Sequence, residues 1–205
     1  MQESTATPTA ETYQAVNPPA VNAFDMLEAL RTFEKRHAER AITQRVYSFA
    51  HGGKEYAVAS NGWAMLAVRA YLISKTALNG LRMLPNTYVD AFAGYFEPGP
   101  KFGALDVPLK RLRDWCGAPK LRRCPRCEQT IDVKRHGGNL FDRAIDRNLI
   151  AMAIAFGNED APIVMYPQGA DPLSPIVFRH EHFLAVVMPM REPIEGLPIY
   201  PEHGS

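Results

Sequence analysis

Hydrophobic and polar positions alternate in short runs near the C-terminal end of the chain. Val, Ile, Phe and Leu dominate residues Pro175–Arg179 and Phe183–Val187, and the polar corner His180-Glu181-His182 joins these runs. Short runs rich in β-branched and aromatic residues around a brief polar corner are typical of a β-hairpin. Ile163–Tyr166 has the same character and predicts one more strand before the hairpin.

The N-terminal half repeats this pattern. It predicts three strands, at Arg45–Phe49, Glu55–Ser60 and Ala64–Leu72. Gly52-Gly53 lies in the first turn between them and Asn61-Gly62 in the second, and both pairs favour tight turns because these residues adopt positive φ easily.

Apolar residues at helical spacing predict three helices, Ala23–Phe33, Asp106–Gly117 and Asp146–Phe156. Asn22 is a suitable N-cap for the first, and Gly157 a suitable stop for the last. A helix followed by three strands indicates an α+β fold.

Two segments give a less regular pattern. Residues Ser74–Pro100 are broken by prolines and glycines and are predicted to be mostly loop, with Tyr88–Tyr95 as a short helix or a strand. Phe102–Leu105 is predicted to be a strand. Residues 1–20 are rich in Thr, Ala and Pro without apolar periodicity, which predicts a disordered tail; residues 192–205 are predicted to be a second tail.

Composition changes this picture little. The chain has 205 residues, 46% of them hydrophobic and 22% charged, which fits one soluble globular domain at 21–191. The net charge of +1 restricts any nucleic-acid binding to local patches. No apolar run approaches the roughly 20 residues that span a bilayer, and the N-terminus lacks the features of a secretory signal. Three cysteines fit a reducing cytoplasm.

Two of those cysteines form the knuckle Cys124-Pro125-Arg126-Cys127. Zn²⁺ in a structural site needs four ligands, and Cys116 and His136 are the nearby candidates to complete the set. Gly137-Gly138 would allow a sharp reversal of the chain after the histidine. Free thiols in a loop, or a knuckle without metal, are the alternatives. The region at about 116–138 is interpreted as an insertion.

The same region is basic. Lys110, Arg111 and Arg113 are followed by Arg122, Arg123 and Arg126, with Asp114 as the single acid nearby. Such a patch attracts phosphate in a salt-dependent way, and a solvated face is the alternative.

Motifs of catalysis are missing from the sequence, with no GxSxG, HExxH or phosphate loop, which argues against an enzyme. His180 and His182 stand two apart and could share a strand face and a metal ion, but a hairpin corner exposed to water explains them more simply.

Two stretches carry a resemblance to a known family. Val186–Arg191, VVMPMR, resembles the C-terminal signature of the bacterial DNA polymerase III beta subunit, the sliding clamp, and Ala59–Val68, ASNGWAMLAV, is similar to a second segment of that family. Trp63 and Ala64 depart from it, since the family usually has histidine and arginine there. The resemblance implies a clamp-like fold of helix-plus-three-strand units, with helices on one face of an antiparallel sheet.

The resemblance also implies a function. Both stretches would line one groove that binds polymerase or clamp-loader peptides, with the residues Gly62, Trp63, Met65, Val187, Met188, Pro189, Met190 and Arg191. Helices of the family line a hole that holds duplex DNA, a role implied here for Arg31, Lys35 and Arg36 and for the basic patch above. Because the family's chains have more domains, a one-domain chain, as from a phage, would need about six copies to close a homo-oligomeric ring. The alternatives are a monomeric clamp mimic that regulates a host clamp, and a zinc-ribbon nucleic-acid module.

Overall fold

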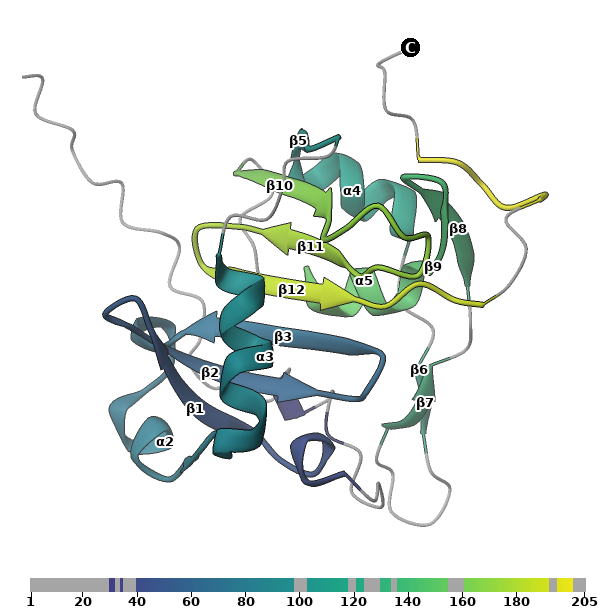
Figure 1. The fold of residues 1–205 in the computed structure, drawn as a ribbon. Helices are drawn as coiled ribbons and strands as arrows, with labels where there is room; N and C mark the ends of the chain where they lie inside the picture. Colours follow the sequence, from purple (N-terminus) through teal and green to yellow (C-terminus); the bar gives the residue numbers. More distant parts are fainter. Residues whose placement is uncertain are drawn as a thin grey trace, which may run out of the picture.

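The computed structural model describes residues 30–31, 34, 40–97, 103–117, 121–123, 130–133, 136–154, 161–191 and 195–200. An eight-stranded sheet runs through the molecule (Figure 1). Its strands, in spatial order, are β4 (Arg82–Met83), β1 (Tyr47–His51), β2 (Lys54–Ser60), β3 (Ala64–Arg69), β12 (Phe183–Val187), β11 (Ile176–Arg179), β10 (Pro162–Pro167) and β5 (Leu105–Pro108). All neighbours pair antiparallel except β1 and β4, so the predicted α+β class with a large antiparallel sheet is confirmed.

The predicted strands are present with shifted ends. The hairpin of β11 and β12 pairs Arg179 with Leu184 across its corner, as its pattern predicted. The first strand begins at Tyr47, two residues later than expected, because Val46 N–H donates to the side chain of Glu34 instead of to a ladder. The third strand ends at Arg69, where the chain turns into the 3-10 helix η2 (Ala70–Leu72).

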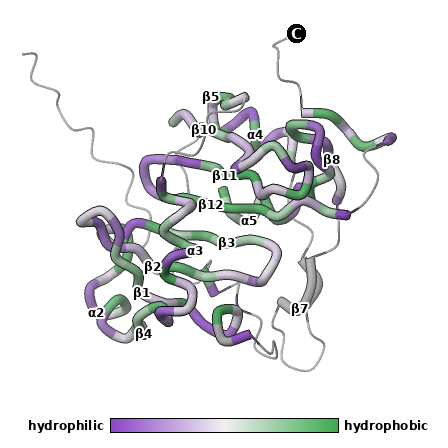
Figure 2. The backbone as a smooth tube through the Cα atoms, in the orientation of Figure 1, coloured by the Kyte–Doolittle hydropathy of each residue, from purple (hydrophilic) through white to green (hydrophobic). Residues whose placement is uncertain are grey.

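Strands β3 and β12 join the two halves of the chain. Their antiparallel register places Ala64 opposite Val187 and Val68 opposite Phe183. Figure 2 shows that hydrophobic positions gather along these central strands. Segments far apart in the sequence therefore lie side by side in the middle of the sheet.

The sheet is covered on both faces. Ala57 and Ala59 of β2 face a core that includes α4 (Leu109–Cys116) and α5 (Arg147–Ala153). Tyr56 and Val58, which alternate with them, face a second core under α3 (Asn86–Phe96). Figure 1 shows α3 in front of the sheet and α4 and α5 behind it. The expectation that helices cover one face holds for α4 and α5 but not for α3.

The segment Ser74–Pro100 is more ordered than the prediction of a loop. It contains α2 (Lys75–Asn79), the edge strand β4 and the eleven-residue α3. Prolines and glycines suggested irregular structure, but Gly80 follows α2, Gly94 lies within α3, and Pro85 directly precedes the first residue of α3. Of the two options for Tyr88–Tyr95, the helix is correct.

The two described helices behind the sheet begin at different kinds of residue. Asp146 caps α5 as expected, because its carboxylate accepts from the N–H of Asn148 at 3.0 Å. The predicted cap Asp106 instead lies inside β5, opposite Val164, and α4 begins at Leu109. Strand β5 thus covers residues predicted as a helix start. Of the predicted first helix, only Leu30 and Arg31 are described, and both are helical.

Two small hairpins lie outside the main sheet. β6 (Leu121–Arg123) pairs with β7 (Thr130–Val133) within the predicted insertion, and β8 (Gly137–Leu140) pairs with β9 (Arg143–Asp146) after it. Gly137-Gly138 therefore lies in a strand and not at a chain reversal. The predicted tail after residue 191 also differs, because its residues 195–200 pack against β8 and bury Tyr200.

Candidate functional site

A pocket of about 120 Å³ opens where the β2–β3 turn, the end of β12 and α3 meet. Its walls are mostly apolar and aromatic. They consist of Ser60, Gly62, Trp63, Ala64, Met65, Phe92, Tyr95, Val186 and Met188. Trp63 is 55% exposed and forms part of the rim. The pocket is open to solvent and offers an apolar surface that a partner can reach.

The β2–β3 turn is fixed by its own polar side chains. The Asn61 side-chain oxygen accepts from the N–H of Trp63 at 2.9 Å and from that of Ala64 at 2.8 Å. Ser60 Oγ donates to the carbonyl of Ala64 at 3.0 Å. Gly62 has a φ of +87°, a conformation in which most side chains are strained. The Asn-Gly signal therefore builds the turn that presents Trp63.

The C-terminal strand reaches this turn through the backbone. Met188 N–H donates to the carbonyl of Trp63 at 2.8 Å, which continues the β3–β12 pairing one step beyond Val187. The two stretches singled out in the sequence, around Trp63 and around Met188, therefore meet at one pocket.

Four of the eight predicted groove residues line the pocket: Gly62, Trp63, Met65 and Met188. The other four lie elsewhere. Val187 points to the opposite face and is fully buried, because neighbouring strand residues face opposite sides. Beyond Met188 the chain leaves β3, and the N–H of Met190 donates to Ala144 of β9 at 2.7 Å. Pro189 is buried and Arg191 is exposed along this path.

The groove prediction missed the α3 wall, which contributes Phe92 and Tyr95 to the pocket. A signal was present: Tyr88, Phe92 and Tyr95 recur at the spacing of one helix face, and that face packs on the sheet. Burial raises the pKa of Tyr95, which keeps its hydroxyl neutral beside the apolar pocket.

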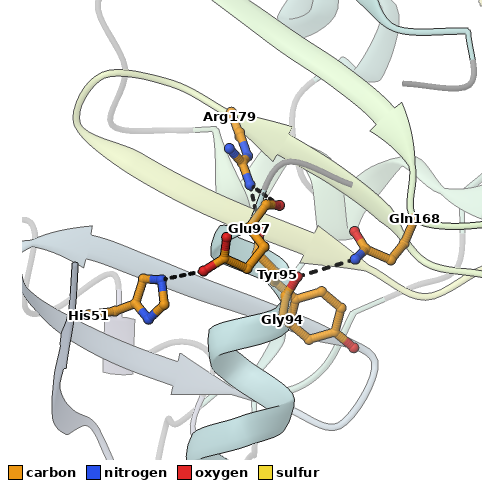
Figure 3. A network of polar contacts seen from close by, with 6 residues as sticks. All are labelled: His51, Gly94, Tyr95, Glu97, Gln168 and Arg179. Atoms are coloured by element: carbon orange, nitrogen blue, oxygen red, sulfur yellow. Dashed lines mark hydrogen bonds and ion pairs between the residues drawn. The ribbon is translucent and has the colours of Figure 1, made fainter. Parts of the chain in front are cut away.

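The last turn of α3 is held by the side chains of Arg179, the last residue of β11, and Gln168, which directly follows β10 (Figure 3). Arg179 Nη2 donates to the carbonyl of Tyr95 at 3.0 Å and to that of Glu97 at 2.6 Å. Gln168 Nε2 donates to the carbonyl of Gly94 at 3.2 Å. Carbonyls at a helix end have no partner within the helix, so these bonds satisfy them. This α3 latch, Arg179 and Gln168, fixes the wall that carries Tyr95.

The described basic residues that were predicted to contact DNA differ in their surroundings. On α4, Lys110 is exposed. Arg113 instead donates to the carbonyl of Ile154 at 3.0 Å, and the Arg111 guanidinium lies 5.8 Å from the Tyr200 ring. Arg31 is exposed. Lys35, Arg36 and Arg126 lie outside the described residues, and Arg122 and Arg123 are described as part of β6.

The zinc prediction is only partly covered by the described residues, because Cys124 and Cys127 lie outside them. Cys116 is fully buried in the core, and burial raises its pKa to about 12. The Arg147 guanidinium contacts His136 Nε2. Among the described residues no group of three or more candidate ligands is close enough to hold a metal. The four-ligand site stays a prediction.

The hairpin corner is less exposed than its sequence suggested. His182 is buried, and its Nδ1 lies 2.7 Å from the Tyr71 hydroxyl. His180 stacks on Phe183 with ring centroids 4.8 Å apart. Burial lowers the pKa of His180 to about 4, with the charge of His182 as a further cause. These contacts are structural.

Comparison with known proteins gives similarity to solved structures alone. No protein-family model and no curated protein sequence matches the chain. A DnaN sliding clamp (DNA polymerase III subunit beta) from Pseudomonas aeruginosa, bound to griselimycin, has a TM-score of 0.49 and 10% identity over 85% of this chain. DNA polymerase III beta chains from Caulobacter crescentus and Streptococcus pneumoniae have TM-scores of 0.45 and 0.44, with 12% and 13% identity over 84% and 83% of this chain. The matches cover 64%, 65% and 64% of those chains, respectively. None of the helices that the structure describes is long and apolar enough to cross a membrane.

Proposed function

We propose that this chain is a non-enzymatic, sliding-clamp-like accessory protein of DNA replication. Its pocket binds an apolar side chain of a polymerase or clamp-loader peptide. One observation carries the proposal: the two stretches that resemble the groove segments of sliding clamps, around Trp63 and around Met188, line the same pocket. They are distant in the sequence, and a chance resemblance gives no reason for them to meet.

The size and lining of the pocket support a peptide anchor. A volume of about 120 Å³ is below the range of roughly 300–1,000 Å³ for cofactor and small-molecule sites. A cavity of about 150 Å³ holds a benzene molecule, so this somewhat smaller pocket is suited to one aliphatic side chain such as leucine. Met65 and Met188 adapt their shape to such a side chain because the thioether is flexible. Apolar anchors of this kind carry most of the affinity of a peptide interface.

Duplex DNA is the second proposed partner. Lys110 on α4 and Arg31 are exposed basic residues of the described chain, and basic side chains bind DNA through its phosphates without reading sequence. Arg113 is expected to contribute less, since its guanidinium holds the end of α5 at Ile154.

Association of several copies into a ring is the third part of the proposal. The sheet ends in two different edge strands, β4 and β5, whose outer sides have no pairing strand among the described residues. Edge strands offer unpaired backbone groups to another chain. Pairing one edge with the other edge of the next copy would be a head-to-tail contact, which closes into a ring when the rotation is suitable.

Two experiments test the proposal. Griselimycin, which is bound in the Pseudomonas aeruginosa clamp, serves as a probe for the pocket. We expect it to change the emission of Trp63, and Met188→Asp to abolish the change while leaving the protein folded. Size-exclusion chromatography with light scattering, with and without nicked circular DNA, tests the ring. A strict monomer under both conditions contradicts the ring, and co-purification of that monomer with a host clamp would support a regulator instead.

A further inference from the structure

The C-terminal segment, residues 195–200, packs onto the body of the protein as an added strand. Asn139 N–H donates to the carbonyl of Pro198 at 2.9 Å, and Tyr200 N–H donates to the carbonyl of Asn139 at 2.8 Å. The segment thereby runs parallel to β8. A Cβ atom at Gly137 would lie 2.7 Å from Leu197 Cδ2, so a larger residue at this position would force the Leu197 side chain to shift.

Tyr200 completes a row of alternating cations and aromatic rings, the Arg–aromatic ladder. Its side chain is 1% exposed and meets the Trp115 ring edge-on, with centroids 5.3 Å apart. The Arg111 guanidinium lies 5.8 Å from the Tyr200 ring, and the Arg147 guanidinium lies 5.5 Å from the Trp115 ring. The ladder thus reads Arg147, Trp115, Tyr200, Arg111.

Tyr200 and Trp115 contact each other through their rings, and the polar atoms of the two side chains do not take part in the contact. Trp115 Nε1 and Tyr200 Oη are buried, and neither has a hydrogen-bond partner in the part of the chain that the structure describes. Buried polar atoms are nearly always paired, so this contact is weaker than its burial suggests. Two backbone bonds, the Leu197 contact at Gly137 and the Tyr200 ring hold the segment, while Ile199 beside it is 70% exposed. A ligand that binds at Trp115 would have to replace these few contacts.

Charge also distinguishes the two sides of this contact. Residues 192–205 contain three glutamates and neither lysine nor arginine. Of these residues, 195–200 are described, and their Tyr200 packs against Arg111 and Trp115 of α4, the helix that also carries the exposed Lys110. A segment without a cation over a basic, aromatic surface is what a polyanion with stacking groups would have to displace.

We propose that Trp115, flanked by Arg147 and Arg111, is a binding site for single-stranded nucleic acid, and that Tyr200 occupies the position of a base in the free protein. Proteins that bind single strands stack bases on aromatic rings and guanidinium planes along a basic groove. Bases within a duplex are stacked on each other and cannot insert in this way, which favours a single strand. Lys110 then meets the phosphates. The C-terminal segment acts as a displaceable cover, independent of the pocket proposed above.

Tryptophan fluorescence can follow this site separately. The chain has two tryptophans, so Trp63→Phe leaves Trp115 as the sole emitter. In this background, Tyr200→Ala and Leu197→Asp loosen the segment. Tyr200→Phe keeps the ring and loses a hydroxyl that has no partner among the described residues, so it is the matched control. Each full-length variant is titrated with a dT15 oligonucleotide, after circular dichroism has verified its fold.

We expect dT15 to quench Trp115 at least tenfold more tightly in Tyr200→Ala and Leu197→Asp than in Tyr200→Phe. Leu197→Asp decides alone if Tyr200→Ala does not fold. Equal affinities in all variants, or no quenching in any, would overturn the proposal. Competition by a 15-base-pair duplex as strong as that by dT15 would also overturn it and would assign the cover to duplex binding. A failure of the pocket to bind griselimycin leaves these outcomes unchanged.

Discussion

The pocket and the Arg–aromatic ladder are both apolar surfaces next to basic or polar groups, but they differ in what covers them. The sequence pattern predicted mostly loop for the segment that forms one wall of the pocket, but in the structure the α3 latch fixes that wall. Trp63 is exposed at the rim. In the ladder, Tyr200 of the C-terminal segment covers the ring of Trp115. The first surface is shaped in advance for a partner, whereas the second must lose its own segment before it can bind. Preorganisation favours affinity, and a cover of this kind favours control.

The largest effect on stability is expected from a substitution on the side of β12 that faces the core instead of the pocket. Val187 and Met188 are neighbours, but Val187 is fully buried and Met188 lines the pocket. We expect Val187→Asp to abolish cooperative unfolding, because an unpaired buried carboxylate costs several kcal/mol. Met188→Asp should change stability by about 1 kcal/mol or less. Thermal unfolding by circular dichroism checks both; equal losses would mean that Met188 belongs to the core.

The latch gives the next largest effect. Arg179→Ala removes both bonds to the end of α3 and should lower the free energy of unfolding by about 1–3 kcal/mol, with faster amide exchange in α3. Glu97→Gln is the control, since it removes only the contact with His51 at 3.4 Å, and its side chain is 69% exposed. Urea unfolding should place that control within about 0.5 kcal/mol of the wild type. Unchanged exchange in Arg179→Ala would show that the wall does not depend on the latch.

The turn at the pocket's rim should respond more weakly. Asn61→Ala removes the acceptor for the N–H groups of Trp63 and Ala64 and should cost about 1–2 kcal/mol in urea unfolding. Trp63 emission should broaden as the turn loosens, while Trp115 and the ladder stay unaffected. A loss of Tyr200 packing in this variant would contradict the independence of the two surfaces.

The last expected effect appears only at acid pH and lies away from both surfaces. The folded protein lowers the pKa of His180 from its ordinary 6.5 to about 4. The unfolded chain therefore takes up this proton first, so the contribution of His180 is present above pH 6.5 and is lost as pH falls toward 4. His180→Gln should flatten the decline of the melting temperature in this window. An identical decline in the variant would assign it to other groups.

The sequence predicted the local parts of this architecture well. The Asn61-Gly62 turn and the β11–β12 hairpin follow from short-range patterns, and the structure contains both. The α3 wall was missed because Pro85 and the nearby glycines suggested a loop, although Pro85 only precedes the helix and Gly94 lies within it. The direction in which each strand residue points was harder to predict. The groove prediction included Val187, whose side chain points into the core because neighbouring strand residues face opposite sides.

The ladder could not be predicted from any stretch alone. Tyr200 lies in a segment without apolar periodicity and is buried against the Trp115 ring, while Leu197 of the same segment packs close to Gly137. These contacts join the end of the chain, α4 and β8, which only the tertiary fold brings together. The pair Gly137-Gly138 was visible in the sequence, but it was interpreted as a chain reversal and not as a site of close packing.

Methyl resonances of the methionines test the central claim, that the pocket accepts an apolar side chain, most directly. The chain has eight methionines; Met65 and Met188 line the pocket and Met190 does not. We predict that N-acetyl-leucinamide at millimolar concentration shifts the methyl signals of Met65 and Met188 and leaves that of Met190 in place. Shifts at Met190 alone, or no shift at Met65 and Met188, would contradict the claim.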